Sequence, residues 1–195
     1  AFQRHATSKL RSDVDLWSIR TMGFRGEALP SIAAVAHVRL RTATRSAEVG
    51  TELEVVGGVV GNSTDAPPVA GTRIDVADLF HNQPARKKFL KSIATECSHI
   101  IRVVQQAALA WPSIQFRVTH NAQELLNHPA VHSERDRIAQ VYRPAFLNQC
   151  VSLQAALPGM AVTGYIVDAI HAKSSRTPQE LFVNRRPIRS LAVSH

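Results

Sequence analysis

A glycine-rich stretch, TMGFRGEALPSIAAVA at residues 21–36, has the residue types that bind phosphate groups. Gly23 and Gly26 bracket Phe24 and Arg25, and a run of small residues typical of a helix follows. Glycines adopt left-handed backbone angles, so successive N–H groups can point into one concavity, to which the helix start adds free N–H groups. The same spacing fits a helical corner in which the glycines only permit close packing. On spacing alone that second interpretation is the commoner one.

Two further segments carry groups that suit an anion or a nucleotide. In the string HATSK, Thr7, Ser8 and Lys9 supply two hydroxyls and an ammonium within three residues. Gly71 and Thr72 open a predicted strand after a loop. Each segment also has an ordinary explanation, an exposed loop for the first and a plain strand start for the second.

The composition favours a polyanionic partner. Among 195 residues, 23 are Lys or Arg and 15 are Asp or Glu, giving a formal net charge of +8. Such a balance suits nucleic acid or a nucleotide, although a solvated basic surface has the same composition. No apolar run approaches the roughly 20 residues that cross a membrane. Cys97 and Cys150 lie far apart without metal-ligand spacing, so we expect neither a disulfide framework nor a zinc site. The expected environment of the protein is a reducing cytoplasm.

The elements that must position these groups form a mixed, mostly antiparallel pattern, which predicts an α+β fold. Strands are predicted at 37–44, at 50–60 with a hairpin turn at Gly57-Gly58, at 71–80, in a hairpin over 114–126, at 151–157, at 160–168 and finally at 180–190. Helices are predicted at 12–22, 31–36, 84–92, 93–110 and before Phe146. Residues 64–71 and 171–179 are predicted loops, and a domain boundary is expected near residue 130.

The strings RHATSK, GFRGEAL, GTRIDVADLFHNQPARKKFL and FVNRRPIRS follow one another between His5 and Arg189. This order resembles the N-terminal ATPase region of the MutL family of DNA mismatch-repair proteins. The family pattern runs close to HATSK, GFRGEAL, GT…V.DLF.N.PAR.KFL and VNGR. GFRGEAL and DLF.N.PAR.KFL together are highly specific, because gyrase and other ATPases of the same GHKL superfamily share the nucleotide fold without these strings.

The resemblance implies a fold and a division into domains. Residues 1–130 are expected to be the later part of a GHKL ATPase domain, a two-layer α/β sandwich, with its lid and sheet strands. Residues 131–195 are expected to begin a second domain, a ribosomal-protein-like β-α-β transducer. Because part of the nucleotide domain would be missing, we expect exposed apolar surface.

The resemblance also implies roles for particular residues. In the family the HATSK lysine approaches the ATP phosphates, the GFRG backbone closes over the triphosphate, and a threonine after a strand-opening glycine approaches the adenine. Carried over by position, the nucleotide-binding set is Thr7, Ser8, Lys9, Gly23, Phe24, Arg25, Gly26, Leu29, Gly71 and Thr72.

The family's VNGR arginine faces DNA, and Arg186 stands at its position beside Arg185. Two residues depart from the family pattern: Pro30 replaces a small residue, and Arg185 replaces the VNGR glycine. Glu27 is interpreted as structural, paired with Arg25. A further basic run, Arg86, Lys87, Lys88 and Lys91, has spacing that suits either DNA phosphates or a solvated helix face.

The family's general-base glutamate, its Mg²⁺-binding asparagine and its adenine-reading aspartate would all precede Ala1, and an HPxK lysine would follow His195. We therefore expect a chain cut from a longer protein, with no catalytic residue and no metal ligand of its own. The resemblance implies that the parent is a bacterial, cytoplasmic, nucleoid-associated ATP hydrolase using ATP and Mg²⁺. It would form an N-terminal homodimer, with no membrane role, and couple mismatch recognition by MutS on double-stranded DNA to a downstream nuclease or helicase.

Two other functions stay open. One is a DNA-binding scaffold module whose nucleotide binding is vestigial, supported by the basic charge. The other is a different GHKL ATPase such as a type II topoisomerase subunit, against which the string DLFHNQPARKKFL argues. A helix of the form E…N and a DNG loop encoded upstream would favour the ATPase, and their absence would favour the scaffold.

Overall fold

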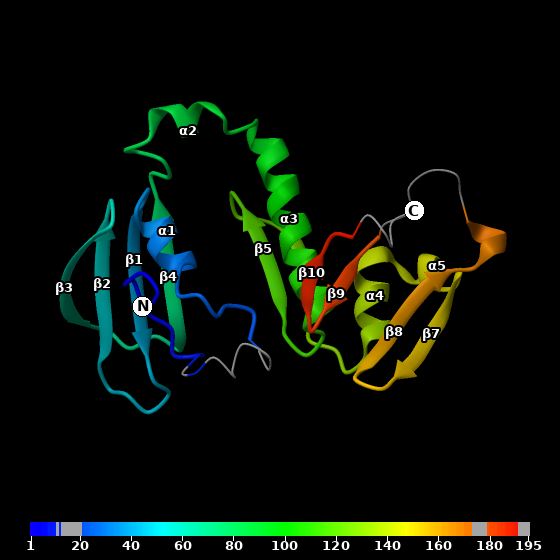
Figure 1. Ribbon diagram of the computed structural model, residues 1–195. Helices are drawn as coiled ribbons and strands as arrows, with labels where there is room; N and C mark the ends of the chain where they lie inside the picture. Colours follow the sequence, from blue (N-terminus) through cyan, green and yellow to red (C-terminus); the bar gives the residue numbers. More distant parts are fainter. Residues whose placement is uncertain (11, 13–20, 173–178, 191–195) are drawn as a thin grey trace. The chain divides into compact units, whose positions relative to one another are not determined.

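The computed structural model describes residues 1–10, 12, 21–172 and 179–190 (Figure 1). Contacts divide the chain into two compact units, Ala1–Lys91 and Ser92–His195. The helix predicted over 12–22 and the loop predicted over 171–179 fall almost wholly outside the described residues.

A four-stranded antiparallel sheet forms most of the first unit (Figure 1). Its strands are β1 (His37–Ala43), β2 (Gly50–Val56), β3 (Val59–Ala66) and β4 (Gly71–Ala77), in the order β3-β2-β1-β4. The predicted turn at Gly57-Gly58 is confirmed, since both glycines have positive φ angles, 56° and 88°. β3 continues through residues 64–66, where the sequence predicts a loop, because they pair with the start of β2.

One short helix, α1 (Ala28–Ala33), precedes the sheet, and it begins and ends three residues earlier than the predicted helix over 31–36. Pro30 lies buried inside it as the third residue. Proline is tolerated there because the first N–H groups of a helix have no partner within the helix. The helix therefore accommodates the departure from the family pattern without losing a possible hydrogen bond.

The core of the first unit lies between α1 and one face of the sheet. Its buried members are Ala33, Ala36, Val38 and Val55, with Phe2 and Leu53 packed against them. Because side chains alternate along a strand, Val38 faces this core and the arginines of β1 face the other side. The first unit ends with α2 (Pro84–Lys88), a short, fully exposed basic helix that has proline in its first turn, as predicted.

The second unit begins with the long helix α3 (Ile93–Ala110), whose bounds match the prediction. Ser92 caps it by accepting a hydrogen bond from the Thr95 N–H at 3.3 Å. The other elements are β5 (Phe116–His120), β6 (Gln123–His128), α4 (Glu134–Tyr142), α5 (Pro144–Leu147), β7 (Cys150–Leu157), β8 (Met160–Val167), a 3₁₀ turn (Ala169–His171), β9 (Leu181–Val183) and β10 (Arg186–Ile188).

The strands of this unit form three antiparallel hairpins, β5-β6, β7-β8 and β9-β10. The first two agree with the prediction. The third corrects the prediction of one strand over 180–190, because the chain reverses at residues 184 and 185, which both have positive φ angles. The mixed, antiparallel arrangement confirms the α+β class.

Hydrogen bonds cross the point near residue 130 where the sequence suggests a domain boundary. Val131 N–H donates to the Pro112 carbonyl at 2.9 Å. The fully buried Arg137 of α4 donates to the carbonyls of Pro112, Ile114 and His128, at 2.6, 2.6 and 3.1 Å. These bonds join α4 to the β5-β6 hairpin, and the division in the contacts comes earlier, where the first unit ends.

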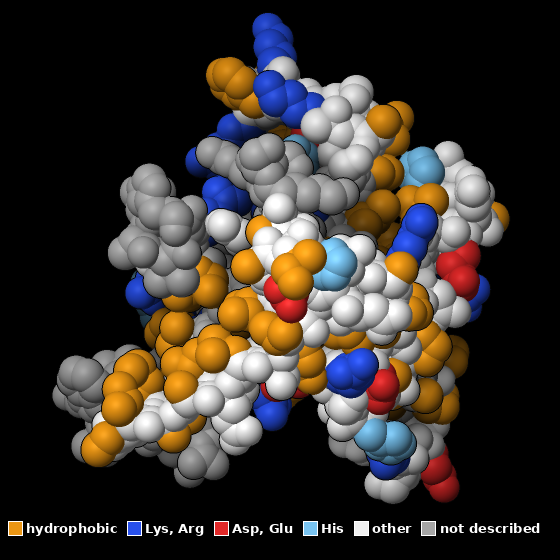
Figure 2. Space-filling model, turned by 90° about the vertical axis from the view of Figure 1, so that its right-hand side faces the viewer, with side chains coloured by type: hydrophobic (Ala, Val, Ile, Leu, Met, Phe, Trp, Pro, Cys, Tyr) orange, Lys and Arg blue, Asp and Glu red, His pale blue; other side chains and the backbone are white. Residues whose placement is uncertain are grey.

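Large apolar side chains are exposed in both units, as expected, and many are visible on the face in Figure 2. Of the helices described, none is both long and apolar enough for a bilayer span. Cys97 and Cys150 are free thiols. Within the described ranges, no group of three or more His, Cys, Asp or Glu side chains could hold a metal ion.

Candidate functional site

The HATSK segment lies directly against the GFRG loop. Gly26 ends that loop with a φ of +62°, and a Cβ placed there would lie 2.2 Å from the carbonyl oxygen of Ala6. No side chain fits at that distance, so the contact requires glycine for steric reasons and for its left-handed angle. The structure therefore brings together the segments that carry two of the three predicted groups of nucleotide-binding residues.

A second contact joins the same segments. His5 Nδ1 lies 3.4 Å from Glu27 Oε1, with both side chains largely exposed. The sequence interpretation pairs Glu27 with Arg25, and the structure corrects this. The Arg25 guanidinium instead lies 5.4 Å from the centre of the Phe24 ring. Arg25 is therefore not neutralised by Glu27 and stays an exposed cation in the loop.

The far end of α1 and the three residues that follow it, 34–36, are held by four hydrogen bonds to consecutive carbonyls. Gly58 N–H donates to Ala33 at 2.8 Å, the Asn82 side-chain amide to Ala34 at 2.9 Å, Phe80 N–H to Val35 at 2.7 Å and Gly57 N–H to Ala36 at 3.2 Å. Carbonyls at a helix end lack intrahelical partners, so these bonds anchor α1. Sequence reasoning assigned no role to Asn82. Its position in the string DLFHN, where an asparagine follows a strand, was the available signal.

Thr72 lies on the sheet face that packs against α1. It stands opposite Thr42 in the β1–β4 register, and the two hydroxyl oxygens lie 2.8 Å apart. Thr42 also donates to the Gly71 carbonyl at 3.1 Å. Because Thr42 and the core residue Val38 are four positions apart on β1, both threonines lie on the core face. Leu29, the remaining predicted residue, is half-buried in α1.

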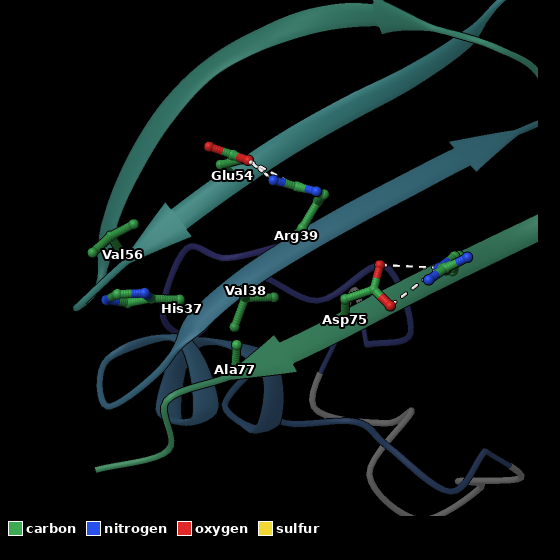
Figure 3. Close-up of a pocket in the computed structure, with 8 residues that line it drawn as sticks. His37, Val38, Arg39, Glu54, Val56, Asp75 and Ala77 are labelled. Carbon is green, nitrogen blue, oxygen red and sulfur yellow. Dashed lines mark hydrogen bonds and ion pairs between the residues drawn. The ribbon is translucent and has the colours of Figure 1, made fainter. Parts of the chain in front are cut away.

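The opposite face of the sheet carries a shallow cavity of about 480 Å³ (Figure 3). Arg39 pairs there with Glu54 at 2.7 Å, as the figure shows, and Arg73 pairs with Asp75 at 3.0 Å. The hydrogen bond from Arg73 lowers the pKa of the Asp75 carboxyl. The cavity therefore presents charges that neutralise one another. None of the predicted site residues lines it, so the cavity and the predicted site are separate features.

No family model matches the sequence. The chain is 39% identical to the DNA mismatch repair protein MutL of Clostridium acetobutylicum over 194 residues, and 43% identical to MutL of Christiangramia forsetii over 195 residues. Each alignment covers 100% of this chain. The chain belongs to the MutL family of DNA mismatch-repair proteins. It spans 31% of each of these MutL proteins, about a third of their length.

Solved structures agree with the MutL assignment. The ATPase domain of Aquifex aeolicus MutL complexed with ADP matches with a TM-score of 0.72 and 25% identity, covering 94% of this chain and 69% of that one. The N-terminal domain of a DNA repair protein matches with a TM-score of 0.73 and 27% identity, covering 97% and 60%. The fold is therefore that of MutL ATPase domains.

The MutL string VNGR reads VNRR here and forms the turn of the β9-β10 hairpin. Asn184 and Arg185 have φ angles of 48° and 65°, so Arg185 keeps the turn in the left-handed region that glycine prefers. That conformation costs a non-glycine residue about 1–2 kcal/mol. The Arg185 guanidinium lies 4.5 Å from the centre of the Trp111 ring. A cation–π stack at an exposed site contributes about 0.5–1 kcal/mol, which offsets part of this conformational cost.

Arg186 begins β10 opposite Val183 and is half-buried. A second side-chain contact, from the Gln106 amide to a Glu180 carboxylate oxygen at 2.8 Å, ties the residue before the hairpin to α3. Arg185 and Arg186 therefore differ in surroundings, since the first stacks on an aromatic ring of its own unit.

Proposed function

We propose that this chain is the nucleotide-responsive part of a MutL-type mismatch-repair ATPase. The observation that carries the proposal is the packing of Gly26 on Ala6, which joins the HATSK segment to the GFRG loop. In this arrangement the Lys9 ammonium and the loop N–H groups bind the phosphates of ATP, and Thr72 approaches the adenine from the sheet. The ADP named for the Aquifex MutL structure supports this assignment.

The residues present fit a triphosphate. Lys9 and Arg25 are exposed cations, and the nearby carboxylate of Glu27 is engaged by His5. Attraction between these cations and the phosphates, together with hydrogen bonds from the loop N–H groups, holds the nucleotide. ATP, when bound, supplies the energy that closes the lid and drives dimerisation, and its hydrolysis resets the protein.

Among the described residues no group of three or more His, Cys, Asp or Glu side chains could hold a metal ion. In the proposed function, the metal ligand and the general base come from the part of the family's sequence that aligns outside this chain. The residues of this chain orient the phosphates and stabilise their charge.

The two units suggest how the function divides. We assign Ala1–Lys91 to the ATPase domain and Ser92–His195 to the transducer-type domain, because the contacts separate there. The sequence interpretation sets this boundary near residue 130. α2 then connects the nucleotide-binding unit to the second unit, and its basic residues are available to DNA phosphates or to solvent.

In the complete gene product, Arg185 and Arg186 contact the backbone of double-stranded or mismatched DNA, and ATP-dependent dimerisation couples MutS to a downstream nuclease or helicase in the cytoplasm. The formal charge of +8 supports the DNA contact.

The test is nucleotide binding by the complete gene product. ADP and a non-hydrolysable ATP analogue are titrated by calorimetry, and light scattering reports the oligomeric state. We expect both nucleotides to bind and the ATP analogue to produce dimers. DNA binding without any nucleotide binding would instead establish the scaffold alternative.

A further inference from the structure

Asn82 holds the end of α1 with its side chain. Its Nδ2 atom donates to the Ala34 carbonyl at 2.9 Å, across 48 positions of sequence. The other three donors at this helix end are backbone N–H groups, which every substitution except proline retains. Asn82 therefore contributes the one bond of the four that depends on the identity of a side chain.

The segment that carries Asn82 is itself fixed in an unfavourable conformation. Asp78 and Phe80 are non-glycine residues with φ angles of 53° and 64°. Such angles persist only where surrounding contacts over-determine them. His37 supplies two of these contacts, since its Nδ1 lies 3.3 Å from Asp78 Oδ2 and its ring lies 4.5 Å, edge-on, from the ring of His81.

The helix between Asn82 and the GFRG loop is too short to act independently. α1 has six residues, which span about 9 Å, and a helix of this length is unstable in isolation. Its position is therefore set by the packing of its buried residues on the sheet and by what holds its two ends. One end is bound by the Asn82 segment, and the other continues into Gly26, which packs on Ala6 of the HATSK segment.

We propose that Asn82 is a positioning residue for nucleotide binding, acting through α1 on the GFRG loop and its contact with HATSK. The proposal rests on the nucleotide-binding function proposed above. Asn82 is not among the predicted nucleotide-binding residues. It fixes the helix whose first residues follow the phosphate loop, and it joins that helix to the segment leading into α2, the connection to the second unit.

The substitution Asn82→Asp tests the proposal because it keeps the shape and removes the donor. At pH 7.5 the new carboxylate repels the Ala34 carbonyl, so we expect faster amide hydrogen exchange over residues 23–36 and about threefold to tenfold weaker ADP binding, the range for one lost hydrogen bond. Asn62→Asp is the matched control, since Asn62 is an exposed asparagine of β3 in the same unit. Asn82→Ala removes the donor without adding charge.

A pH series separates positioning from a general loss of stability. As the pH falls from 7.5 to about 3.5, below the ordinary Asp pKa of about 3.9, the carboxyl introduced by Asn82→Asp takes up a proton and gains an O–H donor. The exchange rates of this variant should then return toward those of the unmodified chain at the same pH. Asn82→Ala should show no such return. Exchange is measured on the 195-residue chain, and ADP binding on the complete gene product.

Three outcomes overturn the inference. The first is that hydrogen exchange over residues 23–36 is unchanged in both Asn82 variants. The second is that the variants lose protection equally throughout the first unit, including β2 and β3. The third is that the complete gene product binds ADP and its Asn82 variants bind it with the same affinity. If the unmodified gene product binds no ADP, the proposed function fails and the proposal for Asn82 fails with it, whereas the exchange data still report whether Asn82 anchors α1.

Discussion

The guanidinium of Arg185 lies 4.5 Å from the centre of the Trp111 ring, joining the β9-β10 turn to the end of α3. The MutL pattern has glycine at this turn position, and Arg185 keeps the same left-handed backbone with a φ of 65°. The stack thus accompanies the departure from the family pattern. Arg185 remains an exposed residue.

Arg185→Gly should change stability little, because two effects oppose each other. Glycine removes the cost of the left-handed backbone conformation, about 1–2 kcal/mol, which stabilises the folded chain. The variant also loses the stack on Trp111, worth about 0.5–1 kcal/mol, and its unfolded chain gains conformational freedom, and both changes destabilise the folded chain. In a Trp111→Leu background the stack is already absent, so Arg185→Gly should stabilise by about 0.5–1 kcal/mol more than in the unmodified chain. Urea denaturation of the four chains measures this coupling, and additive changes would show that the contact contributes nothing.

Gly26→Val should separate HATSK from the GFRG loop. The new Cβ would meet the Ala6 carbonyl at 2.2 Å, so the segment must move. We expect faster hydrogen exchange at residues 3–9 and loss of nucleotide-dependent dimerisation in the complete gene product. Gly159→Val is the control, because Gly159 also has a left-handed φ, +78°, but no atom lies within 4 Å of the position that its Cβ would take. Equal behaviour of the two variants would remove the steric argument for the loop.

Arg186→Glu should weaken DNA binding by the complete gene product. Each phosphate contact contributes about 0.9 to the slope of log affinity against log salt, so the slope should fall by about 1. Arg135→Glu makes the same charge change at an exposed position of α4 and should alter the slope less. Fluorescence anisotropy at several salt concentrations measures both, and a slope unaffected by Arg186→Glu would argue against its role at DNA.

His128 should make the second unit less stable in mild acid. Burial lowers its pKa, the positive charge of Arg137 lowers it further, and its Nε2 has no hydrogen-bond partner among the described residues. The folded chain therefore favours the neutral ring. As the pH falls below the unfolded value of about 6.5, the unfolded chain takes up a proton that the folded chain does not, and stability is lost.

Urea unfolding at pH 7.5 and pH 5.5 checks this direction. The loss of stability on acidification should be smaller in His128→Gln, which cannot titrate at that position. His99→Gln at an exposed position of α3 should keep the full loss. The explanation would be wrong if His128→Gln showed the same pH dependence as the unmodified chain.

Local signals in the sequence were sufficient for most elements. α3 is predicted with its observed bounds because its apolar residues recur with a helical period and Pro112 stops the helix. The strands of the first sheet follow from alternation, and Gly57-Gly58 marks their hairpin. These signals act over a few residues, so they can be detected without knowing what lies nearby in space.

The turn at Asn184 and Arg185 escaped prediction because arginine is not a turn former, and its left-handed angle accompanies a contact with Trp111 far away in the sequence. The contacts of Glu27 and Asn82 also join segments that are separated in the sequence. Glu27 pairs with His5 of the HATSK segment, and the acceptor of the Asn82 side chain is 48 positions away.

By itself the sequence determined the family, through strings such as GFRGEAL and DLFHNQPARKKFL, and the order of helices and strands, through periodicity and turn residues. Only the tertiary structure decided that Gly26 packs on Ala6 and that Asn82 anchors α1. Periodicity reports which face of an element is buried, whereas the partner on that face is chosen by long-range packing, which no local pattern records.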